Sequence, residues 1–174
     1  MKKYIVLLRG INVSGKNKLP MAELRELLND LGFKNVQTYI QSGNIILESD
    51  EGKSVICNKI NEGIQNKFGF DVPVIARTIP QFKKAIASYP FPIDNTKIVG
   101  FVFLNKKVYV SKIEVKDIGN DKYLIDNDMV FIYCETGFAK TKLSNNLFER
   151  KLLVSATTRN YNTTLKLLEL AESN

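Results

Sequence analysis

Apolar residues fall into short runs and helical repeats along the first half of the chain. The continuous run Tyr4–Leu8 predicts a buried strand. Leucines then recur at helical spacing up to Gly32, which predicts a helix that ends at this glycine. Two strand-like runs, Val36–Ile40 and Asn44–Glu48, flank a polar turn and predict a hairpin. A helix with a stripe of isoleucines, a strand at Val72–Ala76 and a further helix complete this half.

The same order of elements returns beyond Tyr89–Asn95, a proline-containing stretch that predicts a linker. The elements expected there are, in order, a strand at Lys97–Leu104, a strand or degraded helix at Val108–Val115, a hairpin around Asp126–Asp128, a helix capped by Ser144, a strand-like run Leu153–Thr157 and a closing helix Asn160–Ala171.

Each half therefore follows the order β-α-β-β-α-β with a helix after it. That order is typical of the ferredoxin-like α-β plait. We predict an α+β protein of two such domains in tandem, over residues 1–90 and 91–174. A short echo supports the repeat, because Val74-x-Ala76-x-Thr78 and Val154-x-Ala156-x-Thr158 each precede a final helix. The main alternative is one larger mixed sheet.

Composition excludes several classes of chemistry. The 174 residues include no histidine, which removes Ser-His-Asp and Cys-His catalysis and histidine-ligated zinc. The two cysteines, Cys57 and Cys134, are far apart in apolar segments, so buried free thiols are expected. We expect no metal and no cofactor. No apolar run approaches the about 20 residues that cross a bilayer, and no signal segment is recognisable, which favours a cytoplasmic protein without a membrane partner.

The net charge of +7 is concentrated at the two ends of the chain. Residues 1–34 carry seven Lys or Arg against three Asp or Glu, and residues 135–174 carry six against four. If these ends meet, they form one basic face, and an anionic small molecule or a nucleic acid is the natural partner. A merely basic, well-solvated surface is the alternative. The sequence leaves the oligomeric state open.

The loop after the first strand offers cations and glycines to an anion. Gly10-x-x-x-x-Gly15-Lys16 has the spacing of a phosphate-binding loop, but Asn17 stands where a Mg²⁺-binding hydroxyl belongs. Residues that separate this loop from the following helix also prevent the usual phosphate cradle. We therefore predict no nucleotide hydrolysis here, and only an anion-binding loop or a flexible basic connection.

Two further polar segments are candidates for the same site. The turn residues Gln41, Ser42 and Asn44 present amide and hydroxyl groups, although turn formation alone would also explain them. Near the C-terminus, Lys140-Thr141-Lys142 precedes the helix capped by Ser144, and Thr157–Asn160 precedes the last helix. Both segments place cations and hydroxyls at helix N-termini, where backbone N–H groups attract anions. Arg159 is not needed as a cap there, and we expect it to contact a ligand.

Three segments together resemble the bacterial family called domain of unknown function 1697. They are Arg9–Lys18 with the continuation Pro20–Leu24, the stretch Thr38–Asn44, and Thr157–Thr163. The resemblance implies two tandem α-β plait domains, and the family has no established activity. Its closing motif usually has Trp where this chain has Tyr161, which keeps a ring but loses the indole N–H.

These observations predict a protein that binds an anionic ligand, such as a nucleic acid, a nucleotide or a phosphorylated metabolite, in a basic cleft between its two domains. A metal-independent small-molecule enzyme that uses the same cleft is the alternative. The residues expected to bind are Arg9, Asn12, Lys16, Lys18, Gln41, Ser42, Asn44, Lys142, Arg159 and Asn160.

Overall fold

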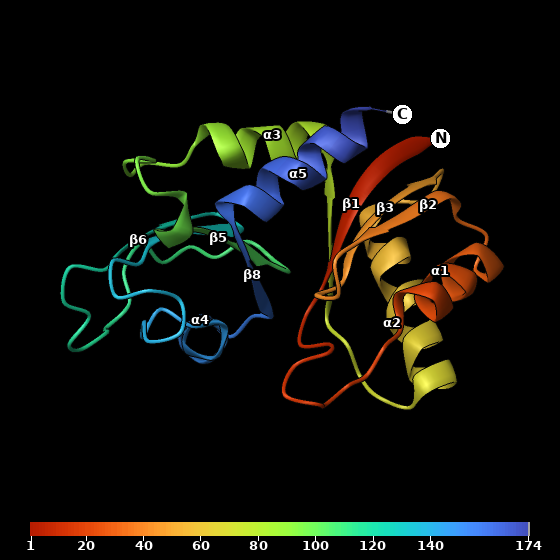
Figure 1. The fold of residues 1–174 in the computed structure, drawn as a ribbon, viewed down its shortest axis with the longest axis horizontal. Coiled ribbons are helices and arrows are strands. Elements are labelled where there is room, and N and C mark those ends of the chain that lie inside the picture. The colour runs from red at the N-terminus through yellow and green to blue at the C-terminus, as the bar shows by residue number, and fades with distance from the viewer. Residues whose placement is uncertain (174) are drawn as a thin grey trace. The chain divides into compact units, whose positions relative to one another are not determined.

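The structure is a computed structural model that describes residues 1–173. Residue contacts divide it into two compact units (Figure 1). Unit 1 comprises Met1–Lys83 and the C-terminal residues from Leu167, and unit 2 comprises Lys84–Lys166. The contact boundary lies before residue 90, and the limits 1–90 and 91–174 stay a prediction about folding units. Within residues 1–173, no helix is long and apolar enough to cross a membrane.

Unit 1 is built on a four-stranded antiparallel sheet in the order β2-β3-β1-β4, as in a ferredoxin-like domain. Its elements are β1 (Lys2–Leu8), α1 (Met21–Asp30), β2 (Lys34–Tyr39), β3 (Asn44–Ser49), α2 (Lys53–Phe68), β4 (Val74–Thr78) and α3 (Ile79–Ala87), which begins in this unit.

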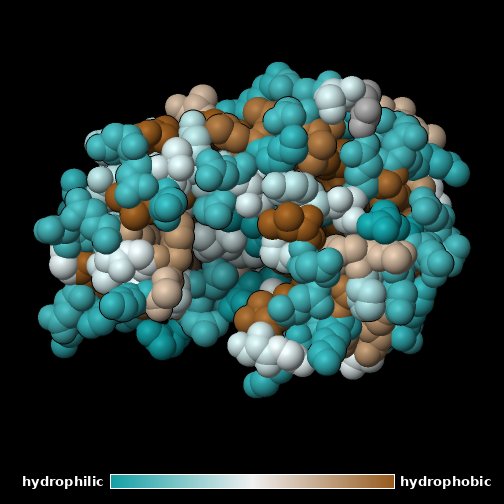
Figure 2. Space-filling model, in the orientation of Figure 1, coloured by the Kyte–Doolittle hydropathy of each residue, from teal (hydrophilic) through white to brown (hydrophobic). Residues whose placement is uncertain are grey.

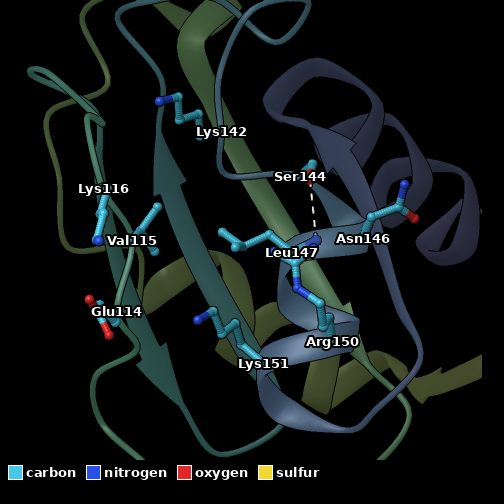
Figure 3. A pocket seen from close by; sticks show the side chains of 9 residues that line it. All are labelled: Glu114, Val115, Lys116, Lys142, Ser144, Asn146, Leu147, Arg150 and Lys151. Carbon is cyan, nitrogen blue, oxygen red and sulfur yellow. Dashed lines mark hydrogen bonds between the residues drawn. The ribbon is translucent and has the colours of Figure 1, made fainter.

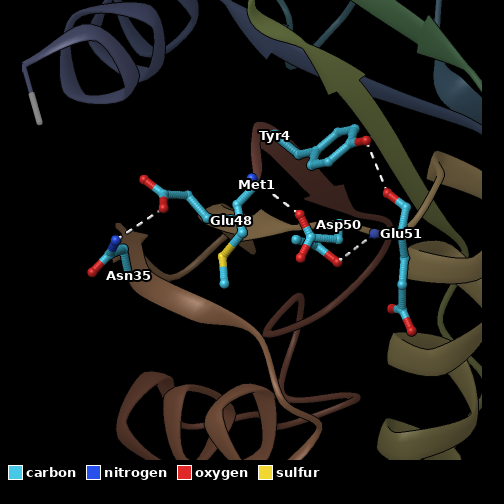
Figure 4. Close-up of polar contacts among 7 residues, drawn as sticks. Met1, Tyr4, Asn35, Glu48, Asp50 and Glu51 are labelled. Atoms are coloured by element: carbon cyan, nitrogen blue, oxygen red, sulfur yellow. Dashed lines mark hydrogen bonds and ion pairs between the residues drawn. The ribbon is translucent and has the colours of Figure 1, made fainter.

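The central strand β1 is buried on both faces, which explains its unbroken apolar run. Tyr4, Val6 and Leu8 face the core that α1 and α2 complete. The start of the strand is held by polar contacts (Figure 4). The N-terminal amine lies 3.0 Å from Asp50 Oδ1, and the Tyr4 hydroxyl donates to the carbonyl of Glu51.

Unit 2 has a second four-stranded antiparallel sheet, in the equivalent order β6-β7-β5-β8. The prediction of two ferredoxin-like sheets is confirmed. Its elements after α3 are a 3-10 turn (Thr96–Ile98), β5 (Val99–Leu104), β6 (Lys122–Asp126), β7 (Met129–Tyr133), α4 (Asn145–Leu152), β8 (Ala156–Asn160) and α5 (Tyr161–Glu172), which ends in unit 1.

Unit 2 lacks the first helix of the plait. Residues 105–121 form neither a helix nor a strand, so both assignments of Val108–Val115 are wrong. Val108, Ile113, Val115 and Ile118 still pack, half-buried, against the core beside α4. These four side chains anchor the segment to the core without the 3.6-residue repeat that would place them on one helical stripe. This irregular segment thus replaces the helix that α1 provides in unit 1.

The helix that remains on this sheet face is also short. α4 has 8 residues, whereas α2 in unit 1 has 16. Part of the second sheet's face is therefore covered only by loops, which allows hollows to form beside α4. On the face of the molecule in Figure 2, apolar residues lie in small groups separated by hydrophilic ones.

A basic pocket and its surroundings

A cavity of about 580 Å³ lies in unit 2 between the irregular segment and α4 (Figure 3). Figure 3 shows Val115 and Lys116 on one side of it, and Leu147, Arg150 and Lys151 of α4 on the other. We call it the basic pocket. Its lining residues are Glu114, Val115, Lys116, Lys142, Ser144, Asn146, Leu147, Arg150 and Lys151.

Positive side chains dominate this lining. The lining has four cationic side chains, those of Lys116, Lys142, Arg150 and Lys151, and a single carboxylate, that of Glu114. Lys142 is 3.7 Å from Asp117, but both side chains are exposed, and an ion pair of this kind is weak. Among the described residues, the other three cations have no ion pair. Four cations around one hollow repel one another, and a bound anion would relieve that repulsion.

Ser144 marks the N-terminus of α4 at the edge of the pocket. Its Oγ accepts a hydrogen bond of 3.2 Å from the backbone N–H of Leu147, which confirms the predicted cap. The positive end of the helix dipole therefore lies at the Ser144 side of the pocket, whereas Arg150 and Lys151 belong to the last turn of α4. The pocket combines side-chain cations with a favourable backbone field at its Ser144 side.

A buried carboxylate fixes the loop that carries Lys142. Asp121 is 4% exposed and accepts hydrogen bonds from the Thr136 N–H at 2.9 Å, the Thr136 hydroxyl at 2.8 Å and the Thr141 hydroxyl at 2.7 Å. Burial alone would raise the pKa of Asp121, but these donors outweigh it and lower the pKa. The ionised carboxylate thus holds Thr141, and with it the backbone that leads into the pocket.

A second cavity of about 360 Å³ shares Ser144 with the basic pocket. We call it the amide pocket, because two asparagines line it. The Oδ1 of Asn145 accepts from the Thr158 hydroxyl at 2.6 Å, and the Oδ1 of Asn160 accepts from the Thr163 N–H at 2.8 Å. Its lining residues are Ile132, Phe138, Thr141, Leu143, Ser144, Asn145, Thr158 and Asn160.

Arg159 lies in a place that the sequence did not predict. It belongs to strand β8, not to the start of a helix, and it is only 7% exposed. Its guanidinium donates to the Thr157 hydroxyl at 2.6 Å and to the Thr158 carbonyl at 3.0 Å. Because side chains alternate along a strand, Arg159 and Asn160 point to opposite faces of the sheet. The strand places Asn160, not Arg159, at the amide pocket.

The loop after β1 is stabilised by its own hydrogen bonds. Asn12 donates to the carbonyls of Leu19 and Gln41 at 3.0 and 2.8 Å, and its Oδ1 accepts from the Leu19 N–H. The N–H groups of Asn12 and Lys16 also donate to carbonyls of the same loop. A phosphate cradle needs such N–H groups to converge on the ligand. Here the loop itself uses the N–H groups of Asn12 and Lys16, while the side chains of Lys16 and Lys18 are exposed.

The turn after β2 lies directly beside this loop. The Leu8 N–H donates to the Gly43 carbonyl at 2.8 Å. Asn44 is fully buried and donates to the Tyr39 carbonyl and to the Ser42 hydroxyl, each at 2.9 Å. Gln41 and Ser42 are exposed. Unit 1 thus joins the loop and the turn by hydrogen bonds, while Asn12 and Asn44 hold the backbone in place.

Sequence reasoning missed most of the basic pocket. It named Lys142 but not Lys116, Arg150 or Lys151. The one available signal was the pair Arg150-Lys151 at the end of a short amphipathic helix, where cations also stabilise the helix C-terminus. Lys116 was hidden because a helix or strand was expected in its neighbourhood.

Where the surroundings shift the pKa of a side chain, they move it further from pH 7. Burial raises the pKa of the Cys134 thiol to about 11, and it also raises the pKa of Cys57. Burial raises the pKa of the Tyr89 hydroxyl as well, which donates to the Ile132 carbonyl at 2.7 Å. Both cysteines are free thiols, as the sequence predicted. None of these groups is suited to exchange protons near pH 7.

Comparisons with known proteins define the chain's relatives. A solved structure, "The structure of conserved bacterial protein SP0830 from Streptococcus pneumoniae", is similar over 98% of this chain and 99% of that chain, with 25% sequence identity and a TM-score of 0.73. No curated protein matches the chain. The family described as "Protein of unknown function (DUF1697)" matches residues 1–131. Because this match spans well over half of the 174 residues, the chain belongs to the DUF1697 family.

Proposed function

We propose that the protein binds a small anionic ligand, with a phosphate group in the basic pocket of unit 2. The observation that carries this proposal is that Lys116, Lys142, Arg150 and Lys151 line one cavity whose lining has a single carboxylate. Phosphate oxygens accept hydrogen bonds from arginine and lysine, and these bonds are stronger when both partners are charged. The cavity volume of about 580 Å³ lies within the range of small-molecule sites.

The exposure of these cations sets the expected strength of binding. Each charge pair near the surface contributes about 0.2–1 kcal/mol, because water screens it. Several such pairs acting together give a modest affinity that decreases as salt increases. We therefore expect micromolar to millimolar binding of a simple phosphate, and tighter binding only for a ligand with further contacts.

The pocket favours binding over catalysis. A proton-transfer enzyme needs a group that changes its charge near the working pH. The shifted groups in this structure are thiols and tyrosines with raised pKa values and a carboxyl with a lowered one. Asp121 also uses its oxygens in three structural hydrogen bonds. The arrangement supports an anion-binding role for the cations, and it offers little support for an acid-base reaction.

The loop Arg9–Lys18 belongs to unit 1 and the basic pocket to unit 2. A single cleft that contains both stays a prediction. The binding proposal does not depend on it, because all lining residues of the basic pocket lie within unit 2.

Calorimetric titration of the full chain with inorganic pyrophosphate tests the proposal. Lys142→Ala and Lys151→Ala should each weaken binding about fivefold at low salt, since each removes one cation from the pocket. Lys97→Ala is the matched control, because Lys97 is an exposed lysine of unit 2 outside the pocket. Equal effects of all three variants, or no binding at low salt, would refute the proposal.

A further inference from the structure

We infer that the ligand is a nucleoside phosphate, whose phosphate occupies the basic pocket and whose base occupies the amide pocket. This inference rests on the proposed function, because it takes phosphate binding in the basic pocket as given. It adds a second cavity, with different chemistry, to the same site. The two cavities adjoin at Ser144, and all their lining residues belong to unit 2.

The amide pocket offers donors to a flat, polar ligand. The Oδ1 atoms of Asn145 and Asn160 are engaged by Thr158 and by the Thr163 N–H. Their Nδ2 groups make no hydrogen bond within residues 1–173. A ligand that meets these two side chains therefore finds donors and needs acceptors of its own. The carbonyl oxygens and ring nitrogens of a nucleobase are such acceptors, and uracil presents two carbonyls.

Apolar groups complete the amide pocket. Ile132 and Leu143 are buried in the core, while Phe138 lines the cavity and is 37% exposed. An aromatic ring beside polar side chains is the usual surround of an unstacked base, which contacts the ring with its face and hydrogen-bonds with its edge. A bare sugar phosphate would leave this apolar surface in contact with water. A lipid chain would bury the two amides without partners, which is costly.

The fold explains why the two cavities adjoin. The strands β7 and β8 provide Ile132, Thr158 and Asn160, and the start of α4 provides Ser144 and Asn145. The basic pocket lies along α4 on the side of the irregular segment. In unit 1, by contrast, a full helix stands at the place of this segment. Loss of that helix and shortening of α4 thus open the hollow that a two-part ligand fits.

Three probes separate the parts of this inference. We would titrate the full chain with uridine 5′-monophosphate, ribose 5-phosphate and inorganic phosphate at the same ionic strength. The nucleotide should bind about tenfold more tightly than ribose 5-phosphate, because stacking and edge contacts of one base commonly contribute that much. If all three phosphates bind equally, the inference is wrong while the proposed function stands. If none binds, the proposed function fails as well.

Variants of Phe138 test the base position directly. Phe138→Leu should reduce nucleotide affinity about tenfold, to that of ribose 5-phosphate, and leave phosphate affinity unchanged. Phe138→Tyr keeps the ring and should retain nucleotide binding. Tyr109→Leu is the control, because Tyr109 is a 94% exposed aromatic of unit 2 outside both cavities. Thermal melts establish that each variant is folded. Unchanged nucleotide affinity in folded Phe138→Leu would overturn the inference.

A 5′-phosphorylated oligouridylate distinguishes the two sources of such a ligand. If it binds more tightly than the mononucleotide, the site takes the end of an RNA chain. If it binds equally or more weakly, the site takes a free nucleotide. In both cases the ligand is a nucleoside phosphate. Weaker binding of the mononucleotide or of the oligouridylate to Phe138→Leu confirms that the base occupies the amide pocket.

Discussion

Arg77 and Arg159 occupy equivalent positions in the two sheets. Each is the residue before last in an edge strand, and Arg77 pairs with Ile5 of β1 as Arg159 pairs with Phe101 of β5. Both are buried, at 6% and 7% exposed, and both donate hydrogen bonds to neighbouring strand residues. Alternation along β8 places Arg159 on the sheet face opposite α4. A buried arginine with internal partners is expected to contribute to stability.

We predict that Arg159→Ala lowers the free energy of unfolding by about 2 kcal/mol, because it leaves the Thr157 hydroxyl without its donor and opens a hole in a buried layer. Arg150→Ala removes an exposed arginine of α4 and should change the free energy of unfolding by less than about 0.5 kcal/mol. Urea denaturation measures both. Equal stability of the two variants would show that Arg159 is not held as described.

Gly43 tests how the turn after β2 is joined to the loop after β1. A Cβ at this position would lie 2.6 Å from Leu8 Cβ and 2.9 Å from Ile11 Cδ1, and φ is +85°. Gly43→Ala should therefore cost about 3 kcal/mol, from backbone strain and crowding together. Gly15→Ala is the matched control, because φ is +71° with open space around it. It should cost only about 1 kcal/mol, and thermal melts that rank the two variants otherwise would contradict this packing.

Asp121 gives a prediction about pH. Its native pKa is lowered, so its carboxylate stabilises the fold fully above the unfolded-state pKa of about 4 and loses that effect as pH falls through the native value. Asp121→Asn should thus cost about 1–3 kcal/mol at pH 7. The difference between the variant and the native protein should stay constant down to about pH 5 and shrink below pH 4. Urea denaturation at several pH values measures it, and a difference that grows in acid would contradict the network.

The sequence predicted secondary structure correctly where apolar residues recur at a regular spacing. The buried run of β1 and the turns at Gln41–Gly43 and Asp126–Asp128 led to the correct fold class, with two ferredoxin-like sheets. The segment Val108–Val115 was misjudged because its apolar side chains contact the core one at a time, without the period of a helix or a paired strand. Only the folded core determines which of them are buried.

Arg159 was misplaced because the last strand was expected to end at Thr157, whereas β8 runs to Asn160. The echo aligns Val74 with Val154, whereas the sheets pair Val74 with Leu8 and Ala156 with the equivalent Leu104. The true repeat is therefore shifted by two residues. This shift moves Arg159 from the expected helix N-terminus into strand β8. No property of the local sequence distinguishes the two alignments, because pairing with β5 sets the register.

Backbone amide shifts during titration with inorganic phosphate test the central claim most directly. We predict saturable ¹H–¹⁵N shifts that are largest within residues 114–116 and 142–151, the two segments that contain the lining residues of the basic pocket. Lys142→Ala should weaken them, and added salt should reverse them. Saturable shifts confined to residues 9–18, or no saturable shift at any residue, would contradict the assignment of the anion site to unit 2.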